Sequence, residues 1–191
     1  RRGTVKERKD MSERLVKLGR FISLILRHSP ETIGIKLDEK GWADVEELII
    51  LMNKNRRKID IDTLKEIVET NNKKRYEFSD DFKKIRACQG HSINVDVELE
   101  QAVPPEFLYH GTAVKNIESI KKDGIKKASR QHVHLSSDYN TAYNVGKRHG
   151  KPYIIKVLSG KMGKDRKKFY ISKNEVWLSD DIETEYLVFE E

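Results

Sequence analysis

The first half of the chain carries apolar residues at helical spacing. Over residues 11–28 they recur three and four positions apart, which is typical of an amphipathic helix with one buried face, with Ser12 as its N-cap. These apolar residues are Leu15, Leu18, Ile22 and Ile25. Pro30 ends this helix, because the residue before a proline avoids helical geometry. Residues 45–52 predict a second helix, and a third follows Asp62, which we interpret as its N-cap.

Short runs of β-branched and aromatic residues follow the helical pattern. Residues 75–78 and 82–86 flank a polar turn and predict a β-hairpin. Three short helices followed by a hairpin indicate a winged-helix-type module, a fold often used on nucleic acids. Beyond the boundary at Pro104-Pro105 the pattern predicts short strands, with helices over 114–122 and 138–148 between them. The predicted strands cover residues 108–110, 132–136, 153–158, 175–178 and 186–190.

The fold class predicted from this pattern is α+β, with two lobes. Residues 11–100 form the winged-helix-like lobe, and residues 101–191 form a compact lobe that is mainly β. Residues 1–10 are charged and without periodicity, so we predict a disordered tail or a cloning remnant there.

Charge narrows the class of partner. The 38 Lys and Arg residues outnumber the 31 Asp and Glu residues and leave a net charge of +7, which favours nucleic acid before membrane. The basic runs 54–58, 73–75 and 161–168 are interpreted as solvated loops, with a supporting role along a nucleic-acid backbone left open. The chain has neither a run of 18 apolar residues nor a signal-peptide core. The single Cys88 excludes an internal disulfide framework, so the sequence predicts a cytoplasmic protein.

Two polar segments lie in the first lobe. Arg27 and His28 end the first helix, where they suit a functional site but would equally complement the helix dipole. Lys84 and Arg86 are two positions apart on a predicted strand, so both point to one face. Gln89, His91 and Ser92 follow a turn, where backbone and side-chain donors are well placed for an anion, with a solvated hairpin as the alternative.

Two further polar segments lie in the second lobe. Residues 109–112 lead from a strand toward a helix, and the glycine among them would let a ligand approach the backbone. Alternation along residues 130–136 places four polar side chains on one side of a strand, namely Arg130, His132, His134 and Ser136. The alternatives are an exposed edge strand, or a zinc site of His132, His134 and Cys88 that lacks the usual ligand spacing.

In this order, the four segments resemble the RNA 2′-phosphotransferase family, the tRNA-splicing enzymes that use NAD to remove a splice-junction 2′-phosphate. The resemblance runs from about Ser12 to the C-terminus. Each motif is weak alone, and together they are specific. The motifs are Leu26-Arg-His-Ser-Pro30, Gly41-Trp-Ala43, Arg86-Ala-Cys-Gln-Gly-His-Ser92, Leu108-Tyr-His-Gly-Thr112 and Arg130-Gln-His-Val-His-Leu-Ser136.

The resemblance implies an RNA-facing winged-helix lobe and an NAD-binding lobe with the ADP-ribosyltransferase fold, and it implies no metal. The family's catalytic residues fall on Arg27, His28, Arg86 and Arg130, and RNA-phosphate binding falls on Lys84, Gln89, His91 and Ser92. The residues implied for NAD are His110, Gly111, Thr112, Ser119, Gly124, His134 and Ser136. His134 resembles the second position of the transferase signature triad. The third, a glutamate in many ADP-ribosyltransferases, is expected at Val176, with Glu175 as the alternative.

The resemblance also implies a reaction in two steps. The RNA 2′-phosphate attacks the nicotinamide-bearing ribose carbon of NAD, nicotinamide leaves, and an RNA-2′-phospho-ADP-ribose intermediate results. The ADP-ribose 2″-hydroxyl then attacks the phosphorus, which gives RNA with a 2′-hydroxyl and ADP-ribose 1″,2″-cyclic phosphate. Without a metal, cationic side chains must neutralise the phosphoryl oxygens, and three arginines and a histidine suit that task.

Other functions stay open at this point. The chain lacks a Walker loop and a dinucleotide glycine fingerprint, which argues against a Rossmann domain. One alternative is an ADP-ribosyltransferase that modifies proteins or nucleic-acid ends without removing phosphate. Another is a non-catalytic winged-helix protein that binds nucleic acid. In each case we expect a monomer.

Overall fold

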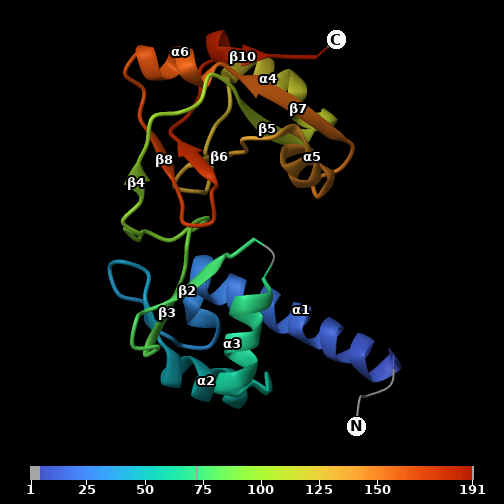
Figure 1. Cartoon of the computed structure of the whole chain (residues 1–191), viewed down its shortest axis with the longest axis vertical. Helices are drawn as coiled ribbons and strands as arrows, with labels where there is room; N and C mark the ends of the chain where they lie inside the picture. The colour runs from blue at the N-terminus through green and yellow to red at the C-terminus, as the bar shows by residue number, and fades with distance from the viewer. Residues whose placement is uncertain (1–4, 72, 191) are drawn as a thin grey trace. The chain divides into compact units, whose positions relative to one another are not determined.

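The computed structural model describes residues 5–71 and 73–190 (Figure 1). The chain divides into two compact units, residues 1–98 and residues 99–191. Both units contain helices and strands, so the mixed α and β composition predicted from the sequence is confirmed. Within the described ranges, no helix is long and apolar enough to cross a membrane.

The part of unit 1 that the structure describes has three α-helices and a small antiparallel sheet. The helices are α1 (Val5–Arg27), α2 (Val45–Lys54) and α3 (Ile61–Thr70), with the short 3-10 helix η1 (Pro30–Thr32) after α1. The strands are β1 (Ala43–Asp44), β2 (Tyr76–Phe78) and β3 (Lys84–Ala87), in the order β1-β3-β2. The predicted helices and the predicted hairpin are therefore present.

Two predicted helix starts are wrong. Helix α1 begins at Val5, so residues 5–10 are helical where a disordered tail was predicted, and residues 1–4 lie outside the described residues. Glu, Lys and Arg are good helix formers, but a segment without apolar residues shows no periodicity to detect. Ser12 therefore lies inside the helix. Helix α3 is capped by Asp60, whose side chain accepts from the Thr63 N–H at 2.8 Å, and Asp62 is its second residue.

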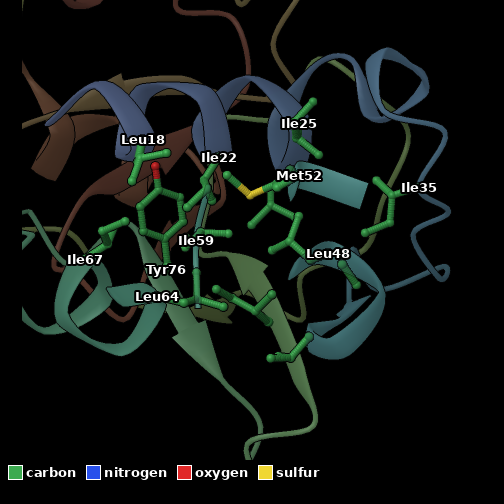
Figure 2. Close-up of a cluster of buried hydrophobic side chains, with 14 of the residues drawn as sticks. Leu18, Ile22, Ile25, Ile35, Leu48, Met52, Ile59, Leu64, Ile67 and Tyr76 are labelled. Carbon is green, nitrogen blue, oxygen red and sulfur yellow. The ribbon is translucent and has the colours of Figure 1, made fainter. Parts of the chain in front are cut away.

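The core of unit 1 holds the C-terminal half of α1 against α2, α3 and the hairpin (Figure 2). Ile22, Ile25 and Leu26 are fully buried, and each such side chain stabilises the fold by about 1.5–3 kcal/mol. The hydroxyl of Tyr76 points to α1 in Figure 2 and donates to the Gly19 carbonyl at 2.8 Å. This packing fixes the last turn of α1, where the predicted site residues lie.

Unit 2 contains two small antiparallel sheets among its described residues. One has the order β10-β7-β5, from β5 (Leu108–Ala113), β7 (Pro152–Val157) and β10 (Leu187–Val188). The other has the order β4-β8-β9-β6, from β4 (Glu100–Gln101), β6 (Val133–Leu135), β8 (Phe169–Ile171) and β9 (Trp177–Ser179). The helices are α4 (Ile117–Asp123), α5 (Tyr139–Lys147) and α6 (Ser159–Lys164), with 3-10 helices η2 (Val114–Asn116) and η3 (Thr184–Tyr186).

The predicted strands of unit 2 are present with shifted bounds, whereas β4, β8 and α6 were not predicted. Helix α6 occupies the start of the basic run 161–168 that we interpreted as a loop. Its sequence contains two glycines, so local propensity is poor, and burial of Met162 and Ser159 stabilises it instead. The two sheets meet where Tyr109 and Ser136 exchange two backbone hydrogen bonds of 2.8 Å. That junction lies next to His110 and His134.

Candidate functional site

In unit 1, the loop after β3 is fastened to the last turn of α1. The Ser92 N–H donates to the Arg27 carbonyl at 3.0 Å, and Ser92 Oγ lies 2.8 Å from His28 Nδ1. The Leu24 carbonyl accepts from the N–H groups of His28 and Ser29. Because the backbone itself closes this turn, the His28 ring is not needed as a cap and is held by Ser92 instead.

His91 is buried near three of the predicted cations. It is 1% exposed, and its pKa falls to about 4, first because burial disfavours the imidazolium and then because Arg27, His28 and Arg86 carry positive charge nearby. Three of the four predicted catalytic residues therefore lie close enough to this neutral imidazole to lower its pKa. The sequence assigned His91 to phosphate binding but did not show that it is buried, because Arg27 and His28 come from a segment far earlier in the chain.

Buried polar atoms without partners occur at the same place. Within the described residues, both ring nitrogens of His91 and the Oε1 atom of Gln89 have no hydrogen-bond partner. Such atoms cost about 1–3 kcal/mol each and are rare in folded proteins. Gln89 and His91 were predicted to offer donors from an open turn. The structure instead buries both side chains, and Ser92 is the exposed member of the three.

Arg86 is buried and ion-paired. Its Nε lies 2.6 Å from Glu77 Oε1, its Nη1 lies 3.3 Å from the Lys40 carbonyl and 3.5 Å from Glu98 Oε2, and its guanidinium carbon lies 4.3 Å from the ring centre of Trp42. The solvated-hairpin alternative is therefore wrong for Arg86, which is 4% exposed.

Lys84 differs from Arg86 in exposure but faces the same segment of chain. Its Nζ lies 3.6 Å from Asp38 Oδ2, and more than half of its side chain is exposed. The side chains of Lys84 and Arg86 thus both contact residues 38–40. This agrees with the prediction that two residues two positions apart on a strand point to the same face. The sequence analysis did not predict that Glu77 and Glu98 pair with Arg86. The register of the hairpin, which sets Glu77 opposite Arg86, could have indicated the first of these pairs.

In unit 2, His110, His134 and Arg130 form a hydrogen-bonded chain. His110 Nδ1 lies 3.1 Å from the His134 carbonyl, and Arg130 Nη1 lies 3.1 Å from His134 Nδ1. A carbonyl only accepts and a guanidinium only donates, so His110 carries its proton on Nδ1 and His134 accepts through Nδ1. Burial lowers the pKa of His110, the hydrogen bond to His134 opposes this, and the charge of His149 adds to it.

The identities of Gly111 and Thr112, the two residues after His110, are explained by the contacts around them. A Cβ on Gly111 would lie 1.8 Å from the Ala142 carbonyl oxygen of α5, so only glycine allows this helix to approach β5. Helix packing therefore explains the glycine, and the approach of a ligand to this backbone stays a prediction. Thr112 is buried, and its Oγ1 accepts from Asn116 Nδ2 at 3.1 Å.

The remaining residues implied for NAD are separated among several elements. Ser119 is exposed on α4 and donates to the Asn116 carbonyl at 2.9 Å. Gly124 ends α4 with a φ of 77°, and a Cβ there would lie 2.1 Å from the Ile182 carbonyl oxygen. Its identity is thus explained by the helix end. Ser136 contributes backbone hydrogen bonds at the junction of the two sheets.

The position expected for the third residue of the triad lies beside β6. Leu135 pairs with Trp177, the first residue of β9, and continued alternation would set Val176 opposite Ser136, on the face that carries His134. Glu175 lies in the turn between β8 and β9 with a φ of 63° and is exposed. The register thus favours Val176 over Glu175.

These residues do not line the cleft found in unit 2, and the described residues show no metal cluster. In the part of the chain that the structure describes, no group of three or more His, Cys, Asp or Glu side chains is arranged to hold a metal ion. The His132 ring packs 5.6 Å from Tyr170. A cleft of about 400 Å³ in unit 2 is lined by other residues, among them Lys127 and Lys167, which are ion-paired with Asp180 and Glu183.

Comparison with known proteins identifies relatives over nearly the whole chain. The model of the family described as "RNA 2'-phosphotransferase, Tpt1 / KptA family" matches residues 13–181. A probable RNA 2′-phosphotransferase of Fusobacterium nucleatum is 58% identical over 175 residues, which are 91% of this chain and 98% of the relative. Proteins of the same name from Flavobacterium johnsoniae and Rhodopirellula baltica are 53% and 46% identical, over 94% and 93% of this chain and 99% and 97% of their own lengths.

Proposed function

Because this chain belongs to the RNA 2′-phosphotransferase, Tpt1 / KptA family, it is a phosphate-transferring enzyme that acts on RNA, and we propose that it removes the 2′-phosphate at the expense of NAD. The substrate class is RNA with an internal 2′-phosphate of the tRNA splice-junction type. Unit 1 takes the role of the winged-helix-like RNA lobe, and unit 2 that of the ADP-ribosyltransferase-like NAD lobe. The order of three helices and a hairpin in unit 1 supports the first assignment.

The observation that carries this proposal is the gathering of Arg27, His28 and Arg86 around the neutral His91. Glu77 compensates part of this positive charge at Arg86, and a cluster of cationic side chains still favours an anionic ligand. A phosphate dianion suits the planar donor forks of arginine. Arg27 and His28 bind the 2′-phosphate in this proposal, with Ser92 in contact with both. Lys84 is assigned a supporting contact with the RNA backbone.

The second unit offers groups that fit NAD. His110 and Arg130 converge on His134, and their donors and acceptors suit a ribose and a pyrophosphate. When bound, NAD supplies the ribose carbon that the RNA phosphate attacks and the 2″-hydroxyl that later attacks the phosphorus. His110 is kept neutral by burial, so it orients this substrate by hydrogen bonding and not by charge. Arg130 adds the positive charge.

The chain's own residues have distinct tasks in the two steps. In the first step the RNA phosphate is the nucleophile, and Arg27 and His28 orient it. In the second step the same phosphorus is attacked, and Arg86 stabilises the charge on its oxygens. The products are RNA with a 2′-hydroxyl, nicotinamide and ADP-ribose 1″,2″-cyclic phosphate, formed through the RNA-2′-phospho-ADP-ribose intermediate.

One incubation separates this proposal from its alternatives. The protein is mixed with NAD and a 2′-phosphorylated oligonucleotide, and RNA products and released nicotinamide are measured. We expect RNA with a 2′-hydroxyl and one nicotinamide per phosphate removed. A stable ADP-ribosylated product would instead indicate an ADP-ribosyltransferase, and binding of RNA without nicotinamide release would indicate a non-catalytic protein.

A further inference from the structure

We propose that Glu77 is a positioning residue for Arg86, an assignment that rests on the proposed function of Arg86 in phosphate removal. Glu77 lies directly opposite Arg86 in the β2–β3 hairpin. Its Oε1 is 2.6 Å from Arg86 Nε, and the two side chains are 15% and 5% exposed. A charge-assisted hydrogen bond of this length between buried groups has one well-defined geometry.

Three contacts together fix the plane of the guanidinium. Glu77 takes the Nε edge, the Lys40 carbonyl accepts from Nη1 at 3.3 Å, and the Trp42 ring lies 4.3 Å from the guanidinium carbon. The guanidinium is planar, and its donors form a rigid fork. A hydrogen bond at the Nε edge and a ring stacked on one face therefore set the direction of the remaining N–H donors. Among the described residues Nη2 has no hydrogen-bond partner, and it is the donor we assign to the phosphoryl oxygen.

Glu98 also approaches Arg86 but is held differently. Its Oε2 is 3.5 Å from Nη1, its side chain is 49% exposed, and its Oε1 pairs with Lys40 Nζ at 2.7 Å. An exposed pair at that distance is weak and screened by solvent. A buried guanidinium that loses its largely buried carboxylate keeps only this weaker partner. Glu77 is therefore the carboxylate that holds Arg86, and Glu98 serves as the matched control.

The kinetic test uses the full chain with NAD and a 2′-phosphorylated oligonucleotide, and it follows the two steps separately. Glu77→Gln keeps an acceptor for Nε but loses the charge, and we expect a second step about 3- to 10-fold slower with the first step unchanged. Glu77→Ala loses both, and we expect a loss of about 30-fold or more. Glu98→Gln should stay within about twofold of the wild type in both steps. Equal rates for Glu77→Gln and Glu98→Gln would overturn the proposal.

A double-mutant comparison separates positioning from general destabilisation. If Glu77 acts through Arg86, the variant with both Glu77→Ala and Arg86→Ala is no slower than Arg86→Ala alone, because the second change has nothing left to orient. Multiplying losses would mean that Glu77 has another role. This double variant also lacks the unpaired buried charge, so it tests the idea even if Glu77→Ala alone does not fold.

A spectroscopic readout keeps this inference distinguishable from the proposed function. In a protein labelled with ¹⁵N, the Arg86 Nε proton should exchange slowly with water in the wild type and in Glu98→Gln. It should exchange at least about tenfold faster in Glu77→Gln, where the hydrogen bond is no longer charge-assisted. A wild type that releases no nicotinamide would refute the proposed function alone. Fast exchange of this proton in the wild type would refute the positioning by Glu77.

Discussion

His28 and Ser92 are joined by a hydrogen bond of 2.8 Å between Nδ1 and Oγ, and the N–H of the same serine donates to the carbonyl of Arg27. Ser92 thus contacts two neighbouring residues of the candidate site, one through its side chain and one through its backbone. The sequence predicted Ser92 as a phosphate ligand. Its contacts give it a further task, which is to set the orientation of the His28 ring.

Ser92→Ala should therefore slow turnover more than it weakens RNA binding. The loss of one hydrogen bond of this kind corresponds to about 1 kcal/mol, or roughly 5- to 10-fold in rate. Ser92→Thr keeps the hydroxyl and is the matched control. Both are measured as kcat with saturating NAD and as the Kd for a 2′-phosphorylated oligonucleotide without NAD. A tenfold rise in Kd with kcat unchanged would return Ser92 to a simple ligand role.

Arg27→Lys should be nearly as damaging as Arg27→Ala. Lysine keeps the positive charge but loses the planar fork that binds two phosphate oxygens at once. We expect a cost of about 2–4 kcal/mol in transition-state stabilisation, or roughly 30- to 1,000-fold in kcat/KM. Turnover of the lysine variant close to the wild-type value would show that Arg27 does not bind the phosphate through a fork.

The parts of the fold that follow from neighbouring residues were predictable from sequence. The buried face of α1 repeats every three or four positions, and Val133 and Leu135 alternate with His134, so both patterns record burial directly. Asp60 was missed as the cap of α3 because Asp62 suits the same role locally.

The parts of the site that depend on distant contacts were not predictable. Arg86 is buried because Trp42 and the Lys40 carbonyl meet it from a segment more than 40 positions earlier in the chain. Gly111 is glycine because the Ala142 carbonyl of α5 lies against it, and this contact cannot be predicted from the neighbouring residues in the sequence. The motifs thus indicated which residues matter, while the structure shows which of them are buried, paired or positioned.

Gly111→Ala should destabilise unit 2 by at least about 3 kcal/mol, because its Cβ would overlap the Ala142 carbonyl and force α5 away from β5. Gly19→Ala is the contrasting variant. Its Cβ would lie 3.6 Å from Ile67 Cγ2, an ordinary contact, and alanine is the better helix former by about 1 kcal/mol. Urea unfolding should show Gly111→Ala as strongly destabilised and Gly19→Ala as equal to or above the wild type. Equal stability of the two variants would contradict the close packing of α5 on β5.

His91 should make the stability of unit 1 depend on pH between 6.5 and about 4. In that window the unfolded chain binds a proton on this residue, while the folded state, with its pKa lowered to about 4, does not. Stability therefore rises with pH across the window and is lost as pH falls through it, by about 3 kcal/mol in all. The His91→Phe variant should lack this part of the slope.

The measurement for His91 uses Trp42 as the reporter of unit 1. The chain has two tryptophans, so Trp177→Phe leaves Trp42 as the only one. The free energy of unfolding is compared between His91→Phe and its parent at several pH values, because the difference cancels other titrating groups. Replacement of the exposed His149 by Asn is the control and should leave the slope as it is. An unchanged slope in His91→Phe would mean that the folded state protonates His91 readily.

Arg86→Ala should slow the second step more than the first. A cation beside the phosphate binds it in the first step but also dampens its attack as a nucleophile, so the net help is modest. In the second step the phosphorus is attacked, and the charge on its oxygens must be stabilised in the transition state itself.

The RNA-2′-phospho-ADP-ribose intermediate should therefore accumulate in Arg86→Ala, visible as a slower band on a gel that is chased slowly to product. Arg27 and His28 variants should stall earlier, with little intermediate. Because Arg86→Ala removes the ion pair with the largely buried Glu77, its unfolding temperature is measured first, and the assay is run well below it. A folded Arg86→Ala protein that is inactive without any detectable intermediate would place Arg86 in RNA binding or in the first step, and its assignment to the second step would fail.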